Sequence, residues 1–286
     1  MASKLERNVS ELNRNSLSLI LIYLVLIALG LLMLFPFLWM VLSSFKPLHE
    51  VIRFPPTLLP VSPTVSNYTE VFARLNFARY YINTIITSVI PTTVTVLTAS
   101  IAGYGFAKYE FPGRNAIFWL VLATMMIPYP VTIVPLYVII HRLGLVDTYT
   151  GLIIVSLSSA FGIFLMRQFF LTIPDDLLDA ARIDGCSELK IFTKIVWPLS
   201  KPALATLTIF NFSGNWNAYI WPMLVVNSDR LRTLSIAIPL FNGQFHQYPN
   251  LVYAASVMAV VPVILVFVFN QRYFTEGIAL SGLKGK

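Results

Sequence analysis

Long apolar runs separated by short polar segments dominate this chain of 286 residues. The first run, residues 17–42, has no charged residue and exceeds the roughly 20 residues that a helix needs to cross a bilayer core of about 30 Å. It is too long for a signal-peptide core, and no small-x-small cleavage site follows it, so we expect a retained span. The pattern predicts an all-α, polytopic membrane protein with six transmembrane helices, at residues 17–42, 81–106, 116–140, 151–170, 203–226 and 251–270.

Composition supports the membrane interpretation. Charged residues make up 12% of the chain, whereas soluble domains carry about 25%. The single cysteine, Cys186, excludes an internal disulfide and a cysteine-cluster metal site. We therefore expect a short N-terminal segment, residues 1–16, followed by one transmembrane domain, residues 17–286.

The net charge of +7 is informative through its distribution along the chain. Six spans place both termini on one side of the membrane. With that side taken as the inside, 13 of the 20 Lys and Arg residues lie there, and seven lie in the three outer loops. The positive-inside rule then predicts cytoplasmic N- and C-termini.

Prolines interrupt several predicted spans. A proline removes a backbone donor and bends a helix, which membrane helices tolerate when their neighbours satisfy the freed carbonyl. These prolines are compatible with ordinary bundle packing and equally with hinges in helices that open a path. The stretch YPVTIVP, residues 129–135, is the strongest candidate for a broken helix.

A polar segment, residues 172–202, lies between the fourth and fifth predicted spans. Pro174 suits the first turn of a helix, and Asp175 and Asp176 lie near its positive N-terminal end. Gly185 follows where a left-handed helix stop is favoured. The segment thus begins with a short amphipathic helix.

A second helix is predicted to follow this stop. Ser187 is a suitable N-cap, Glu188 adds a favourable first-turn charge, and Pro198 is expected to end the helix. The resulting helix–turn–helix elbow has two interpretations. It is either a well-folded connecting loop or a docking surface for the cleft of a partner.

The sequence of the elbow resembles a motif of a known protein family. Ala180 and Ala181, then Gly185, then nine residues and the stretch 195–198 (IVWP), resemble the cytoplasmic signature of permease subunits in binding-protein-dependent ABC importers. The family pattern is Glu-Ala-Ala, three residues, Gly, nine residues and Ile-x-Leu-Pro.

Two positions depart from that pattern. Asp179 stands where the family has Glu, and Trp197 stands where it has Leu. The aspartate keeps the charge on a shorter stem, so the geometry of any salt bridge that it makes is in question.

Other stretches resemble the carbohydrate branch of this family, namely residues 43–72, 77–89 and 216–226. The last 15 residues, RYFTEGIALSGLKGK, resemble the tail of the maltose-type second permease. The resemblance implies a type I ABC importer permease fold and a sugar as the solute.

The resemblance also implies partners in a prokaryotic plasma (inner) membrane: two copies of a cytoplasmic ABC ATPase, a second, related permease and a periplasmic or lipid-anchored solute-binding protein. ATP and Mg would be bound by the ATPases, because this chain has no phosphate-binding loop. No metal-binding or catalytic motif is present, so we expect a subunit that is not an enzyme, contacts lipid and binds no nucleic acid. The docking residues that the resemblance implies are Asp179, Ala180, Ala181, Gly185, Ile195 and Pro198.

Polar and aromatic residues of the fifth predicted span are the candidates for the solute path. Asn211 and Asn215 are i,i+4 neighbours on one helix face, and Trp216 and Tyr219 follow. Polar groups are costly in a membrane and often functional there. Inter-helix hydrogen bonds and interfacial aromatic packing explain the same residues, so both interpretations stay open. In the first outer loop, Lys46, Glu50, Arg53 and Glu70 are expected to form a solvated surface.

Two alternative functions differ from this interpretation. The same type of permease would serve a non-sugar solute such as a polyol or a glycerophosphodiester. An ATPase-independent secondary carrier would be expected to show internal repeats and buried ionisable residues. The chain shows no clear repeat, and its predicted spans are nearly free of charge at their centres.

Overall fold

The computed structural model describes residues 2–243 and 247–283, and these residues are almost entirely helical. The helices are α1 (Ala2–Ser44), α2 (Leu48–Val51), α3 (Ser66–Arg74), α4 (Phe77–Lys108), α5 (Arg114–Thr124), α6 (Tyr129–Arg142), α7 (Tyr149–Ile153), α8 (Ala160–Phe170), α9 (Asp175–Ile183), α10 (Glu188–Ile191), α11 (Trp197–Leu199), α12 (Lys201–Trp216), α13 (Ile220–Val225), α14 (Leu234–Ala237) and α15 (Pro249–Leu283). Shorter turns are η1 (Ile154–Ser156), the π-helical η2 (Phe192–Val196), η3 (Asp229–Leu231) and η4 (Ile238–Phe241).

The chain divides into two compact units. One consists of Met1–Ala73 with Phe241–Met258, and the other of Arg74–Leu240 with Ala259–Lys286. The second unit contains α4 to α14, and therefore the elbow and most of the predicted spans.

Three described helices are long and apolar enough to cross a membrane: Leu19–Ser44 of α1, the whole of α4, and Pro249–Tyr273 of α15. The first covers all but two residues of the predicted span 17–42, and the other two contain the predicted spans 81–106 and 251–270. The apolar side chains along α1 are mostly exposed within this chain. Such a surface suits hydrocarbon, where lipid tails or partner helices cover it.

Two further predicted spans are broken. Residues 116–140 form α5 and α6, bent by 96°, and residues 151–170 form α7 with η1 and then α8, bent by 40°. Counting each bent pair as one span brings the candidates among the described residues to five. At the sharper break the N-cap Pro128 adopts an extended backbone and donates no hydrogen bond, so the helix restarts only at Tyr129.

The prediction of one continuous helix over 203–226 is wrong. Helix α12 ends at Trp216 and α13 begins at Ile220, which leaves residues 217–219 outside both helices. Asn217 caps the first helix, and its side-chain Nδ2 donates to the Ser213 carbonyl at 2.9 Å. A polar side chain that bonds to its own helix end competes with continuation of the helix.

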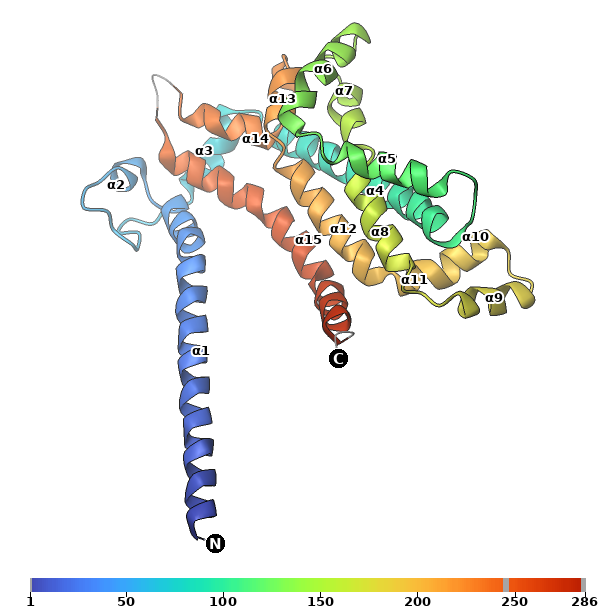
Figure 1. Cartoon of the computed structure of the whole chain (residues 1–286). Coiled ribbons are helices and arrows are strands. Elements are labelled where there is room, and N and C mark those ends of the chain that lie inside the picture. The colour runs from blue at the N-terminus through green and yellow to red at the C-terminus, as the bar shows by residue number, and fades with distance from the viewer. Residues whose placement is uncertain (1, 244–246, 284–286) are drawn as a thin grey trace. The chain divides into compact units, whose positions relative to one another are not determined.

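The core of the second unit forms where α4, α8 and α12 run beside one another (Figure 1). Backbone approach is closest between α4 and α8, where a Cβ added to Gly103 would lie 2.8 Å from the Cβ of Met166. A Cβ added to Gly162 would lie 3.0 Å from that of Ala99. Small residues at helix crossings give the close contact that holds membrane helices together without a hydrophobic driving force.

In the first unit, the prediction that Lys46 and Glu50 are solvated is wrong. Only 2% of Lys46 and 4% of Glu50 is exposed. The Lys46 ammonium donates to the Thr57 carbonyl, while the Glu50 carboxylate accepts from the Thr57 hydroxyl at 2.9 Å and the Val61 amide at 2.8 Å. Burial raises the pKa of Glu50, but these hydrogen bonds outweigh it and leave the pKa below its ordinary value. Arg53 is exposed, as expected.

Candidate functional site

The first helix of the elbow, α9, ends at a glycine stop, as predicted. Gly185 has a φ of +77°, a conformation that only glycine adopts without strain. Its amide donates to the Arg182 carbonyl and the Cys186 amide donates to the Ala181 carbonyl, both at 3.0 Å. This pair of hydrogen bonds is the Schellman motif, which satisfies the last carbonyls of a helix and turns the chain sharply.

The two alanines of the elbow motif differ in their exposure to solvent. Ala181 is 7% exposed and packs with Leu178 in the core under the elbow, whereas Ala180 is exposed. Two large apolar side chains of the elbow are also exposed, Ile183 at 86% and Leu189 at 73%. In Figure 1, α9 and α10 project from one end of the α4–α8–α12 bundle. The elbow therefore presents apolar groups at a polar end of the unit.

An arginine network holds the two helices of the elbow together. The Arg182 guanidinium pairs with Asp179 at 2.6 Å and with Glu188 at 2.7 Å. Asp179, which replaces the family's glutamate, is thus engaged within its own chain. Hydrogen bonds from Arg182 and Tyr109 hold the pKa of Glu188 below its ordinary value, and the two carboxylates raise the pKa of Arg182. Arg182 and Glu188 therefore stay charged at neutral pH.

Two residues at the end of α4, Lys108 and Tyr109, join it to the elbow. Lys108, whose side chain is 4% exposed, donates from Nζ to Asp175 at 2.7 Å and to the Ile173 carbonyl at 2.6 Å. Tyr109 donates to Glu188 at 2.6 Å. Burial and this hydrogen bond raise the pKa of the Tyr109 hydroxyl, so it remains a donor. Sequence reasoning missed both residues, although they directly follow the second predicted span.

The second helix of the elbow ends at Leu199, one residue after Pro198, close to the predicted end. Helix α10 continues through the π-helical η2 into α11, and Pro198 lies exposed within that last turn. A proline cannot donate to the carbonyl one turn earlier, and the wider π turn directly before it accommodates this missing bond. Ile195 is half-buried against the core that Ile191 and Val196 enter.

The predicted path residues do not all share one site. Trp216 is buried and donates from Nε1 to the Ala259 carbonyl at 2.9 Å. Asn211 donates to the Leu207 carbonyl of its own helix at 3.0 Å. Asn215 and Tyr219, in contrast, both line a cavity of about 530 Å³. Of the four predicted residues, the structure brings these two together at a cavity.

The cavity lies where three helix breaks meet. Tyr129 begins α6 after the first break, Ser156 ends η1 before the second, and Asn217 to Tyr219 form the third. The residues around it are Thr87, Tyr129, Leu136, Leu152, Val155, Ser156, Gly214, Asn215, Asn217, Ala218, Tyr219, Ile220, Trp221 and Pro222. The tyrosine before Pro130 and the polar run of 211–219 were the sequence signals for this site.

A carboxylate fixes the loop that follows α13. Asp147 accepts hydrogen bonds from the amides of Asn227 at 3.1 Å and Ser228 at 3.0 Å, and from the Ser228 hydroxyl at 2.9 Å. The hydrogen bonds from Ser228 are the main reason that the pKa of Asp147 lies below its ordinary value. Helix α13, which bears part of the cavity lining, is thereby anchored at its far end.

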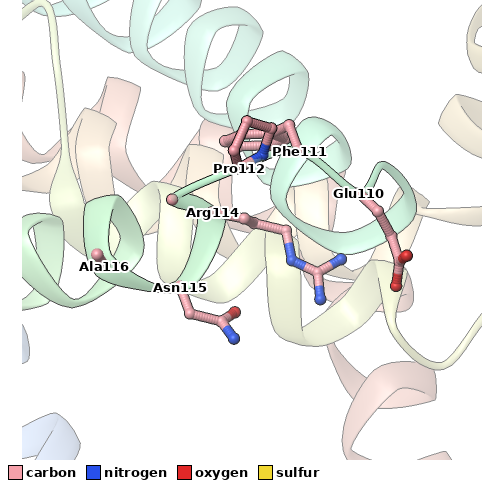
Figure 2. A pocket seen from close by; sticks show the side chains of 7 residues that line it. Glu110, Phe111, Pro112, Arg114, Asn115 and Ala116 are labelled. Atoms are coloured by element: carbon pink, nitrogen blue, oxygen red, sulfur yellow. The ribbon is translucent and has the colours of Figure 1, made fainter.

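A second hollow, of about 520 Å³, is lined by the consecutive residues 110–116, which run from the loop after α4 into the first turn of α5 (Figure 2). Figure 2 shows the side chains of Glu110 and Arg114 extending from this stretch. All of its lining comes from one short stretch of sequence, so it lacks groups that converge from distant parts of the chain. Within the described part of the chain, no group of three or more His, Cys, Asp or Glu residues could hold a metal ion.

Comparison with known proteins agrees with this architecture. The family model "Binding-protein-dependent transport system inner membrane component" matches residues 95–279. The arabinooligosaccharides transport system permease protein AraQ of Halalkalibacterium halodurans is 37% identical over 254 residues, covering 88% of this chain and 91% of the relative. The sn-glycerol-3-phosphate transport system permease protein UgpE of Pectobacterium atrosepticum is 35% identical over 241 residues, covering 82% and 86%.

A solved structure is similar over nearly the whole chain. It is a bacterial ABC transporter involved in the import of the acidic polysaccharide alginate, and one of its chains superposes with a TM-score of 0.80. That match is 29% identical and covers 89% of this chain and 95% of the other. The broken spans and the projecting elbow, together with a family match over more than half of the chain, lead to one conclusion: the chain belongs to the inner-membrane permease components of binding-protein-dependent ABC transport systems.

Proposed function

We propose that this chain forms half of the translocation path of a sugar ABC importer and that its elbow, residues 172–202, docks on a cytoplasmic ATPase. Like its family, the chain is a multi-pass inner-membrane permease subunit and not an enzyme. The observation that carries the proposal is the exposure of Ile183 and Leu189 on an elbow that an arginine network holds rigid. A rigid amphipathic helix suits a groove in a partner.

The motif residues take different parts in this proposal. Ala180 and Pro198 lie on the exposed surface and would contact the ATPase, with Gly185 shaping the turn between them. Ala181 and Ile195 pack inward and would hold the elbow on the bundle. Asp179 would act through Arg182, which it orients, rather than by a direct contact.

The proposed topology has six spans with both termini in the cytoplasm. Helices α1, α4 and α15 each supply one span, the bent pairs α5–α6 and α7–α8 supply two, and α12 with α13 supplies the sixth. Residues 1–16 then form a cytoplasmic segment before a single permease domain, residues 17–286, of the type I importer fold. The excess of Lys and Arg in the inner segments supports this orientation.

The proposed assembly contains two ATPase subunits that bind ATP and Mg, a second permease and a solute-binding protein. The similar solved structure is that of a bacterial ABC transporter, which supports an assembly of this kind. ATP-driven closure of the ATPases would move the elbow, and the elbow would move the bundle to which it is attached.

A sugar is the proposed solute because the relative AraQ is named for arabinooligosaccharide transport. The alternative is a solute such as glycerol 3-phosphate, for which the relative UgpE is named. Aromatic and amide side chains around the cavity favour the sugar, since sugars offer both flat apolar faces and hydroxyls.

Co-purification in mild detergent tests the docking surface. Ile183→Asp with Leu189→Asp places charge on the exposed apolar side, and Leu143→Asp is the matched control, because Leu143 is 62% exposed but lies after α6. We expect the double variant to lose the ATPase while it retains the second permease, and the control to retain both. If the ATPase stays with the double variant at the wild-type ratio, the elbow is not the docking site.

A further inference from the structure

The cavity at the three helix breaks carries the further inference. In the hydrocarbon region, non-helical backbone is tolerated only where protein buries it or where it lines a water-filled space. Residues 125–128, 157–159 and 217–219 interrupt three successive predicted spans. One cavity touches the helix end at each of these breaks. The three breaks therefore border a single cavity in the bundle.

The lining has a specific chemistry. Two phenol rings, those of Tyr129 and Tyr219, stand beside the amides of Asn215 and Asn217. Asn217 uses its Nδ2 on the Ser213 carbonyl, which leaves its Oδ1 as an acceptor. A cavity of about 530 Å³ also lies in the size range of small-ligand sites.

Charge is the feature that this lining lacks. Of the described residues around the cavity, none is Asp, Glu, Lys, Arg or His. The carboxylate of Asp147, just before α7, is occupied by the amides after α13. An anionic solute would lose hydration on entering without gaining a counter-charge, which is strongly unfavourable.

We propose that this cavity is a solute subsite within this chain, selective for an uncharged, hydroxyl-bearing saccharide segment and closed to phosphate- or carboxylate-bearing solutes. The tyrosine rings would pack on the apolar faces of the sugar, and the asparagine amides would exchange hydrogen bonds with its hydroxyls. The inference rests on the proposed function, since it assigns the solute class of the same path. It separates this chain from relatives that are named for charged solutes.

Saturation-transfer NMR on the detergent-purified complex of this chain with its second permease and ATPases tests the proposal. This method detects weak binding directly, and omission of the binding protein removes the selectivity of that protein from the result. The probes are arabinotriose, which is neutral, and sn-glycerol 3-phosphate, which is anionic. The variants are Tyr219→Ala and Asn215→Ala, and the matched control is Phe210→Ala, because Phe210 is 56% exposed on α12 but does not line the cavity.

We expect arabinotriose to give a signal with the wild type and with Phe210→Ala, and a signal reduced about fivefold or more in each lining variant. sn-Glycerol 3-phosphate is expected to give none. An unchanged arabinotriose signal in both lining variants would overturn the subsite, as would its absence from the wild type. A glycerol 3-phosphate signal that Tyr219→Ala abolishes would overturn the charge selectivity.

Failure of the proposed function is recognised separately. If neither the ATPase nor a second permease co-purifies with the wild-type chain, the importer assignment fails before any probe is added, and the subsite falls with it. Co-purification at the wild-type ratio also shows that each lining variant is folded, so a lost arabinotriose signal then reports on the cavity alone.

Discussion

Tyr109, the residue that follows α4, donates a hydrogen bond of 2.6 Å to Glu188 in the first turn of α10. The same carboxylate pairs with Arg182 of α9, so one group ties together three helices. The elbow is therefore attached to α4 as well as to the two helices that flank it in sequence.

Tyr109→Phe is expected to weaken coupling between ATP hydrolysis and uptake. Loss of a hydrogen bond to a carboxylate frees the elbow to shift relative to α4, and because Glu188 is partly exposed we expect only about a threefold fall in solute moved per ATP. Uptake and hydrolysis are measured together in proteoliposomes. Tyr149→Phe is the control, since it removes an equally short hydroxyl bond, to Asn83, away from the elbow. Equal ratios in both variants would argue against coupling through Tyr109.

Lys108→Met is expected to lower the thermal stability of the purified chain. The substitution keeps the apolar stem but leaves the Ile173 carbonyl without its donor, which costs about 1–2 kcal/mol. The ion pair itself adds little, because Asp175 is 76% exposed. Thermal unfolding in detergent measures the effect. Lys190→Met, at an exposed position of α10, is expected to have an unchanged Tm.

Gly103→Ala and Gly105→Ala form a matched pair. A methyl group on Gly103 would lie 2.8 Å from the Met166 Cβ and 2.9 Å from the Arg167 backbone nitrogen, whereas nothing lies within 4 Å of one on Gly105. We expect the first to destabilise the chain by about 1–3 kcal/mol and the second to be neutral. Similar thermal stability for the two variants would show that α4 and α8 do not approach this closely.

Acid is expected to release the loop that Asp147 anchors. Its pKa is lowered in the folded chain, so its contribution to stability is complete above the ordinary value of 3.8 and is lost as pH falls through the lower folded value. Asp147→Asn should remove this acid-dependent part and leave lower stability at neutral pH. Proteolysis rates of the 227–240 segment between about pH 2 and pH 7, a range that extends below the ordinary pKa of a carboxyl group, measure the change. A wild-type rate that is constant below pH 4 would contradict the assignment.

The features that could be predicted from the sequence depend on local chemistry. The glycine stop at Gly185 depends on a backbone angle that one residue type favours, and the apolar runs of α1, α4 and α15 need only length. The break before Tyr129 was also indicated, because prolines cluster there. Each of these features lies within one stretch of sequence.

The features that could not be predicted depend on contacts between segments that are distant in sequence. Lys46 and Glu50 are buried because the segment around Thr57 and Val61 folds over them, and no local pattern specifies that approach. Lys108 meets Asp175 only after α4 and α8 have packed. The separation of Ala180 from Ala181 follows from helical phase and was accessible in principle, but it required knowing which side of α9 faces the bundle.

The glycine contacts between α4 and α8 have a mechanical consequence. At Gly103 and Gly162 no side chain separates the two helices, so their backbones come into close contact. Sliding along such a contact would drive Cβ atoms of adjacent residues into the opposite backbone, whereas a change of crossing angle disturbs few atoms. A push on the elbow would therefore change the angle between α4 and α8 rather than slide one helix along the other.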